Sequence, residues 1–269
     1  MNNTTAGGAP PAIPERESSF ELLRLLCMFF ILFLHVFGSS LNIIGSSVAA
    51  TVFESFFIVA VNCFVLISGY FSINAGWRSF VRLYVFCVFY YLLFAVISAL
   101  NITGAHPFGL SSLKRIALAF FPFTHSGNWF LQVYFCLFLM SPILNQVSAS
   151  LGKHKYVACL AVLTVINIWM GFYADNPIPL NSNPNSNGYN IMSFIYLYFI
   201  GRYIYLHLGD SYNIRTYLAV YTLGSLALAG LILLVVKLQI SDWYVLKLSS
   251  LNYNNPLILS SSVALFLVF

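Results

Sequence analysis

Charge is scarce in this chain of 269 residues. Only 7% of the residues are Asp, Glu, Lys or Arg, and 60% are hydrophobic. A soluble domain carries about 25% charged residues, so this chain has too few charges to cover a surface that faces water. The scarcity excludes a soluble globular protein. The formal net charge of +5 is better explained by membrane topology than by nucleic-acid binding.

Short motifs of several enzyme classes are also missing. The sequence has no phosphate-binding P-loop, no His-Glu-x-x-His zinc motif and no Gly-x-Ser-x-Gly elbow. Its five cysteines show no metal-ligand spacing, and their odd number argues against a complete disulfide framework. All five lie in apolar stretches and are expected to be small buried hydrophobes. We therefore predict no metal site and no bound cofactor.

The chain is rich in apolar runs of about 20 residues, the length that a helix needs to cross a bilayer. These runs lack the ten-residue polar and apolar alternation of barrel strands. They predict an all-α fold, a polytopic transmembrane helix bundle. We expect eight spans, at about 20–44, 48–72, 78–100, 128–147, 155–174, 190–208, 215–237 and 255–269. The last run is short for a span, so we expect either a truncated chain or a final helix that relies on its neighbours.

We expect the chain to consist of a short N-terminal tail and one transmembrane domain. Residues 1–18 are polar and rich in proline and glycine, which predicts a disordered cytoplasmic tail, and residues 19–269 form a single transmembrane domain. With the N-terminus inside, eight of the 12 Lys and Arg residues fall on the cytoplasmic side, as the positive-inside rule favours. Segment 112–123 is expected to be an interfacial or re-entrant piece on the outer side.

Arg24 and His35 are the most informative pair. Eleven steps of about 100° bring the two side chains onto one helix face, roughly 16 Å apart along the axis. Ionisable groups in a bilayer are costly, which favours a functional site facing the bundle interior. A neutral imidazole at His35 could act as a general base towards a hydroxyl or carry an acyl group. The alternative is a histidine that hydrogen-bonds a neighbouring helix and serves packing only.

Glu54 is the only acidic residue well inside a predicted span, because Glu21 lies at the edge of the first one. It lies near the predicted depth of His35, six residues or so from the outer end of its helix. A carboxylate there could orient the imidazole and stabilise its protonated form. The alternative is a glutamate at the outer interface that meets water. The sequence leaves both interpretations open.

Three arginines gather at the predicted cytoplasmic ends of the first and third helices: Arg24, Arg78 and Arg82. Guanidinium groups bind phosphates through paired hydrogen bonds, so the three could hold a nucleotide-like donor. The alternative is that they mark the cytoplasmic side and reach towards lipid phosphates.

A second polar group lies at the predicted outer end of the fourth helix. It consists of His125, Asn128 and Trp129. These side chains could line a site for the acceptor of the reaction. The alternative for Trp129 is an anchor at the membrane interface, where tryptophan is enriched.

The order of several motifs resembles the membrane acyltransferase-3 family of bacterial sugar and polysaccharide O-acyltransferases. Glu21-Leu22-Leu23-Arg24-Leu25-Leu26, followed by His35, resembles the opening helix of that family. Further matches follow in order along nearly the whole chain, at residues 64–71 (FVLISGYF), 128–131 (NWFL) with Tyr134, 141–145 (SPILN), 198–203 (YFIGRY) and 255–257 (NPL). Two features depart from the family: three residues lie between Arg78 and Arg82, where Arg-x-x-Arg with two is frequent, and eight spans are visible where about ten are common.

The resemblance implies a multi-pass protein of the bacterial inner membrane that moves an acyl group, most commonly acetyl, from cytoplasmic acyl-CoA to a hydroxyl of a cell-surface or lipid-linked sugar. Acyl-CoA would be a co-substrate, with its phosphates near Arg24, Arg78 and Arg82 and its thioester near His35. The partners would be this donor, a carbohydrate acceptor and membrane lipid, with no nucleic acid. Whether His35 is a base or an acyl carrier stays open.

A transporter or flippase for a glycolipid or small solute is the alternative function. Transporters often contain paired broken helices in two matching halves, frequently as an inverted repeat. Neither feature is visible in this sequence. A non-catalytic membrane scaffold is a third possibility, but it would need no aligned Arg24 and His35.

Overall fold

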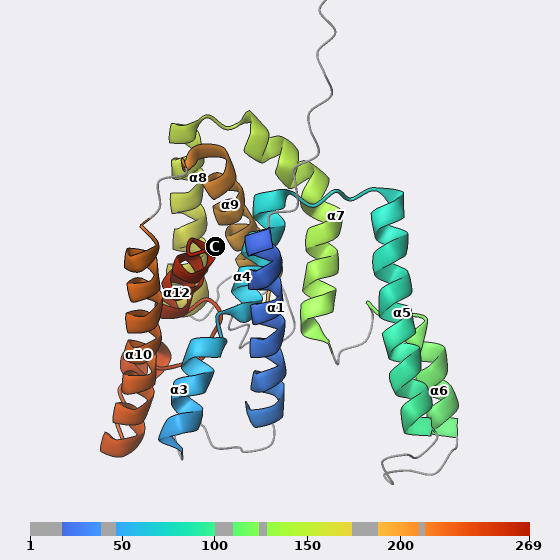
Figure 1. Cartoon of the computed structure of the whole chain (residues 1–269), viewed down its shortest axis with the longest axis horizontal. Coiled ribbons are helices and arrows are strands. Elements are labelled where there is room, and N and C mark those ends of the chain that lie inside the picture. The colour runs from blue at the N-terminus through green and yellow to red at the C-terminus, as the bar shows by residue number, and fades with distance from the viewer. Residues whose placement is uncertain (1–17, 39–46, 100–109, 124–127, 174–187, 210–212) are drawn as a thin grey trace, which may run out of the picture.

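The described part of the chain is helical. The computed structural model describes residues 18–38, 47–99, 110–123, 128–173, 188–209 and 213–269, which contain helices and connecting turns and no strand. The elements in chain order (Figure 1) are α1 Ser18–Phe33, η1 Leu34–Gly38, α3 Val48–Phe57, α4 Ala60–Phe71, α5 Trp77–Ala99, α6 Leu110–Ala119, α7 Trp129–Ser150, α8 Lys153–Thr164, η2 Val165–Tyr173, α9 Ile191–His207, α10 Ile214–Leu238, α11 Trp243–Leu248 and α12 Pro256–Phe266. The predicted all-α class is confirmed.

Six helical stretches of the described residues are long and apolar enough to cross a membrane. They are Ser18–Val36, Val48–Phe71, Trp77–Ile97, Trp129–Ser150, Lys153–Tyr173 and Ile214–Leu238. Each falls on a predicted span. The two other predicted spans correspond to α9, with 17 residues, and α12, with 11, which are shorter than the rest. The total of eight spans and the cytoplasmic N-terminus stay predictions.

Helix starts follow ordinary capping chemistry. Side-chain oxygens of Ser47, Asn128, Asn190 and Asp242 each accept a hydrogen bond from a backbone N–H in the first turn of the helix that follows. These residue types are favoured there because they satisfy N–H groups that have no partner within the helix. Asn255 caps α12 in the same way, directly before a proline. Asn128-Trp129 and Asn255-Pro256 are thus helix starts.

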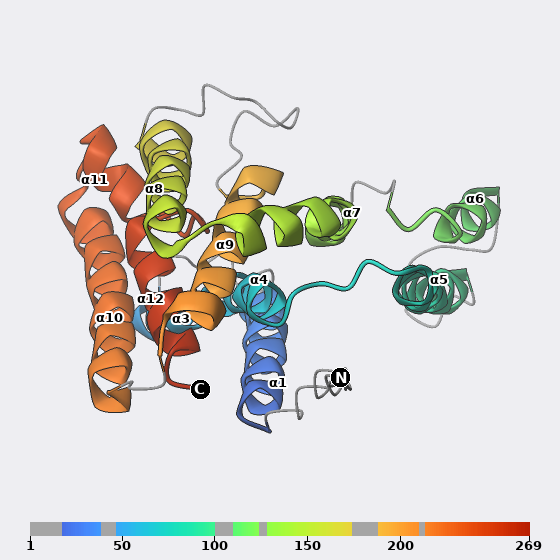
Figure 2. The same ribbon diagram turned by 90° about the horizontal axis from the view of Figure 1, so that it is seen from above.

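Helix α4 forms the centre of the bundle, against α1, α9 and α12 (Figures 1 and 2). Its contact with α9 is very close: a Cβ atom added at Gly69 would clash with the Tyr198 carbonyl, and one added at Gly201 would clash with the Leu66 carbonyl. Small residues permit such close approach of helices in a membrane, where packing provides much of the association energy. This contact fixes α4 relative to α9.

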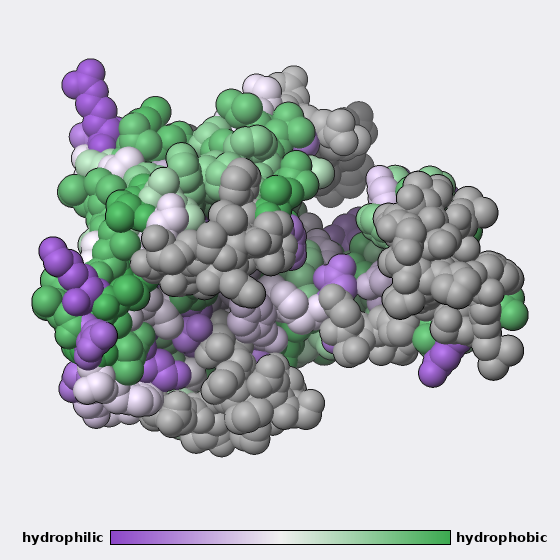
Figure 3. All heavy atoms as spheres, turned by 90° about the horizontal axis from the view of Figure 1, so that it is seen from below, coloured by the Kyte–Doolittle hydropathy of each residue, from purple (hydrophilic) through white to green (hydrophobic). Residues whose placement is uncertain are grey.

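Helices α5 and α6 stand apart from the rest of the bundle (Figures 1 and 2). They pack on each other, and Tyr84 donates a hydrogen bond to the Phe120 carbonyl at 2.9 Å. Aromatic contacts of Phe80 and Phe123 with Phe135 connect the pair to α7. Seen from below, hydrophobic side chains cover much of the described surface and a hollow separates the α5–α6 pair from the other helices (Figure 3). Segment 112–123, predicted to be interfacial, is largely this short helix α6.

Candidate functional site

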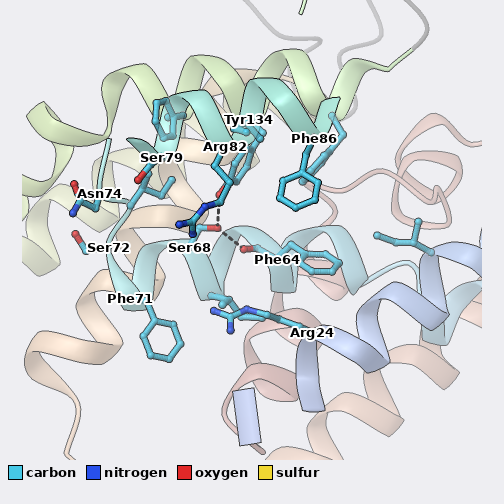
Figure 4. Close-up of a pocket in the computed structure, with 16 residues that line it drawn as sticks. Arg24, Phe64, Ser68, Phe71, Ser72, Asn74, Ser79, Arg82, Phe86 and Tyr134 are labelled. Atoms are coloured by element: carbon cyan, nitrogen blue, oxygen red, sulfur yellow. Dashed lines mark hydrogen bonds between the residues drawn. The ribbon is translucent and has the colours of Figure 1, made fainter. Parts of the chain in front are cut away.

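A cavity of about 590 Å³ lies where α4 faces α5. Its walls come from α1, α4, the turn that follows α4, α5 and α7 (Figure 4). The lining is largely aliphatic and aromatic, and its polar members are Arg24, Ser68, Ser72, Asn74, Ser79, Arg82 and Tyr134. Ligand sites are typically apolar cavities with a few well-placed polar groups. This cavity has that composition.

Two arginines bring positive charge to the cavity. Arg24 reaches it from α1 and Arg82 from α5, and both side chains face α4 (Figure 4). A terminal nitrogen of Arg24 lies 2.6 Å from Glu21 Oε1, and its guanidinium lies 5.4 Å from the centre of the Phe71 ring. Within the described residues no carboxylate pairs with Arg82. The cavity therefore carries a net positive charge and suits an anionic ligand.

Two hydroxyl groups meet in the middle of the cavity. Ser68 donates to the Phe64 carbonyl at 2.8 Å, and its oxygen lies 3.3 Å from the Tyr134 hydroxyl (Figure 4). Because the single Ser68 proton is directed to Phe64, Tyr134 is the donor to Ser68. Sequence reasoning did not select either residue as a site residue. The signal for them was that each falls in a motif shared with the acyltransferase resemblance.

Arg78 does not line the cavity. It lies in the first turn of α5, one turn before Arg82, and its side chain is exposed. The spacing of four residues places the two on the same side of the helix. The structure thus brings two of the three predicted donor-binding arginines to one cavity and leaves the third outside it.

His35 lies in η1, a π-helical turn that ends the first helix, and its side chain is exposed. It does not line the cavity, whereas Ile31, four residues earlier, does. A π-helical turn contains more residues than an α-helical one, so the face calculated for a regular α-helix does not apply to this last turn. His35 therefore follows the lining residue Ile31 in the chain without contributing to the cavity. Isolated π-helical turns are frequent at functional sites.

Glu54 is buried in α3 with 7% of its surface exposed. This burial argues against the alternative of a glutamate that meets water at the interface. Its Oε2 atom has no hydrogen-bond partner among the described residues. A buried carboxyl oxygen without a partner is costly, so this position would gain from a polar group brought by a ligand or by a movement of the protein.

Trp129, at the start of α7, belongs to an aromatic cluster. Its ring centre lies 4.3 Å from that of Tyr189 and 5.4 Å from that of Tyr253. Burial raises the pKa of both tyrosines, so their hydroxyls stay neutral. Asn128 caps α7 by accepting from the Leu131 N–H at 3.3 Å. His125, the third member of the predicted acceptor group, lies outside the described residues.

Comparison with known proteins gives one result that covers most of the chain. The family model Acyl_transf_3, described as an acyltransferase domain, matches residues 17–269. The match includes the cavity, the η1 turn and the aromatic cluster. Searches of curated proteins and of solved structures gave no match.

Proposed function

The chain belongs to the Acyl_transf_3 family of acyltransferase domains, and on this premise we propose that it moves an acyl group from cytoplasmic acyl-CoA to a hydroxyl of a cell-surface or lipid-linked sugar. Acetyl is the simplest group for this role. The membrane would be the bacterial inner membrane. Membership of the family and six apolar helices long enough for a bilayer already make it a membrane acyltransferase.

The observation that carries the donor assignment is the cavity with Arg24 and Arg82. Its volume of about 590 Å³ falls within the usual range for small-molecule sites, about 300–1,000 Å³. Coenzyme A combines phosphate groups with a long, weakly polar arm that ends in the thiol. The two guanidinium groups suit the phosphates, and the aromatic and aliphatic walls suit the arm. Arg78, in the turn before Arg82, could meet a phosphate that remains outside the cavity.

The chemical step assigned to His35 is acyl transfer from a thioester. The acceptor hydroxyl attacks the thioester carbonyl carbon, so that a C–O bond forms and the C–S bond breaks. The imidazole takes the hydroxyl proton and passes it to the departing thiolate, which yields the ester and the CoA thiol. In the second route the ring nitrogen first takes the acyl group and releases the CoA thiol, and the hydroxyl then attacks the acyl-imidazole. Glu54 would stabilise the positive ring.

The acceptor is proposed to bind near the aromatic cluster. Trp129, Tyr189 and Tyr253 offer ring faces and neutral hydroxyls, a combination that suits a sugar. His125 and Asn128 are the further members of the acceptor group proposed from the sequence.

Binding of coenzyme A to the purified full chain in lipid nanodiscs tests the donor assignment. In an Arg24→Ala, Arg82→Ala double variant, the dissociation constant for coenzyme A is expected to rise about tenfold or more. The reason is that a hydrogen bond to a charged group contributes about 1.5–3 kcal/mol. The matched control is Arg215→Ala, which removes an exposed cation from the start of α10 and should leave binding unchanged. Equal affinities of the double variant and the wild type would refute the donor site.

Mass spectrometry of surface glycans from cells with and without the gene tests the acceptor assignment. The proposal predicts an ester-linked acyl group that is present only with the gene, and its mass identifies the group. A transporter would change the amount of a glycan at the surface and leave its mass unchanged.

A further inference from the structure

The turn between α4 and α5 is held by side chains from two distant helices. The Ile73 N–H donates to the Tyr198 hydroxyl of α9 at 3.0 Å. The Ile73 carbonyl accepts from Asn145 Nδ2 of α7 at 3.0 Å, and Ser141 Oγ, whose proton is directed to the Phe138 carbonyl at 2.8 Å, lies 3.4 Å from it. The Tyr198 hydroxyl in turn donates to Asn145 Oδ1 at 2.5 Å. Both backbone polar groups of one residue outside any helix are thus satisfied; we call Ile73, Ser141, Asn145 and Tyr198 the Ile73 network.

This turn forms one wall of the cavity. Ser72, Ile73 and Asn74 all line it. Ser72 has a φ of 64° and a ψ of 119°, a backbone conformation that a residue with a side chain rarely adopts. Such a conformation persists only where its surroundings impose it. The Ile73 network, at the next residue, supplies that constraint.

The same turn determines where α5 begins. The chain passes from Ile73 to Trp77, the first residue of α5, and Arg82 follows one turn and a half later. Only 6% of the membrane-spanning part of α5 is buried, so packing against helices other than α6 does little to fix it. The position of Arg82 therefore depends strongly on the turn that precedes the helix.

The Ile73 network also explains why three separate motifs occur together. Residues 64–71, 141–145 and 198–203 lie far apart in the sequence, yet they meet at this turn. The glycine contacts between α4 and α9 bring Tyr198 next to the end of α4, and Arg202 donates to the Tyr70 carbonyl at 3.3 Å. The motifs thus supply the end of α4 and the side chains of Asn145 and Tyr198, which hold Ile73.

We propose that Asn145 and Tyr198 are positioning residues for donor binding, which hold the cavity wall and Arg82 in the arrangement that acyl-CoA requires. This inference rests on the proposed function, because it takes the cavity as the donor site. A wall that is already ordered spares the ligand the entropy cost of ordering it. Neither residue lines the cavity itself, so the effect is exerted through Ile73.

The test compares two buried tyrosines in the full chain in nanodiscs. Tyr198→Phe removes the hydroxyl of the Ile73 network. Tyr156→Phe removes the hydroxyl of an equally buried tyrosine that donates to the Phe199 carbonyl at 3.1 Å and does not line the cavity. We expect the dissociation constant for coenzyme A to rise about tenfold in Tyr198→Phe and to stay within about twofold of the wild type in Tyr156→Phe.

A second variant and a second measurement make the test independent of folding defects. Asn145→Asp keeps the acceptor for Tyr198 but replaces the donor to the Ile73 carbonyl by an oxygen. We expect it to weaken coenzyme A binding like Tyr198→Phe. Without ligand, amide hydrogen exchange over residues 72–76 should increase in both variants and not in Tyr156→Phe.

Three results would overturn the proposal. Unchanged exchange over residues 72–76 in Tyr198→Phe would show that the network does not hold the turn. An equal loss of affinity in the two tyrosine variants would show a general effect of lost stability. A wild-type protein that binds no coenzyme A would refute the donor assignment of the proposed function and the donor role of the network with it, even if the exchange changes as expected.

Discussion

Helices α4 and α5 follow each other in the chain and are similarly apolar, yet their surroundings are opposite. In the stretch Val48–Phe71, which contains α4, 67% of the membrane-spanning window is buried, whereas the value for Trp77–Ile97 in α5 is 6%. The difference lies in the residues between the large apolar ones. Asn62, Ser68 and Gly69 give α4 hydrogen bonds and close helix contacts, while α5 presents a surface of aromatic and branched side chains. Small and polar residues favour contact with protein within a membrane.

The cavity lies at the boundary between these two environments. One side is the rigid centre of the bundle, and the other is a helix with few contacts to the rest of the protein. A ligand at this boundary contacts α1 and α4, which are held in place by packing. It also contacts α5, whose position depends on the turn before it. We therefore expect substitutions in α4 to affect stability most, and substitutions at the cavity to affect binding and activity.

The largest effect is expected where α4 meets α9. Gly69→Val places a side chain against the Tyr198 backbone and should prevent the close contact, at a cost of more than about 3 kcal/mol. The expected result is loss of folded protein in size-exclusion chromatography in detergent. Gly230→Val, in α10, is the matched control because an added Cβ there meets nothing within 4 Å, and it should fold normally. A well-folded Gly69→Val protein would show that α4 is not fixed by this contact.

The next largest effect concerns chemistry and not stability. His35→Ala should insert and fold normally, since the side chain is exposed, and should lower acyl transfer by a factor of about 10²–10⁴, which is typical for loss of a general base. The rate is measured as ester formation on the glycan by mass spectrometry. Transfer at the wild-type rate would exclude His35 as base and as acyl carrier.

A smaller effect, on the affinity for coenzyme A, is expected to differ between the two arginines of α5. Both side chains are exposed, but Arg82 lines the cavity and Arg78, one turn earlier, does not. Arg82→Ala should weaken coenzyme A binding about tenfold, whereas Arg78→Ala, which lies outside the cavity, should change it by less than about fivefold, because an exposed ion pair contributes at most about 1 kcal/mol. Calorimetric titration of the two single variants provides the values. A larger effect at Arg78 would place the phosphates outside the cavity.

The smallest effect is expected on the exposed face of α5. Phe94 is 67% exposed, so Phe94→Ala should change the thermal stability in nanodiscs by about 0.5 kcal/mol or less. Leu66→Ala, at a fully buried position of α4, should cost about 2–5 kcal/mol. Similar losses at the two positions would mean that another protein surface covers α5 in the membrane.

Part of this architecture could be predicted from the sequence. The apolar runs predicted the all-α class and placed each of the six long helices, because the length needed to cross a bilayer is a strong constraint. The motifs around Arg24 and His35 predicted the family. Arg24 and Arg82, two of the predicted donor residues, do line one cavity.

The remaining features depend on contacts between residues far apart in the chain. Apolarity alone could not separate α4 from α5, since lipid and protein interiors both accept apolar side chains. The shared face of Arg24 and His35 was calculated for a regular α-helix, and the π-helical turn at His35 alters it. Asn128 proved to be a helix cap. The network at Ile73 joins α7 and α9 to a turn that carries no sequence signal of its own.

We propose above all that the acyl donor binds in the cavity between α1, α4, α5 and α7. The most direct test of this proposal gives isotope-labelled acetyl-CoA to inside-out membrane vesicles and measures the label on the glycan. The account predicts labelled glycan with the wild type and with Arg215→Ala, and a large loss of label with the Arg24→Ala, Arg82→Ala double variant. Equal labelling by the double variant and the wild type would contradict it.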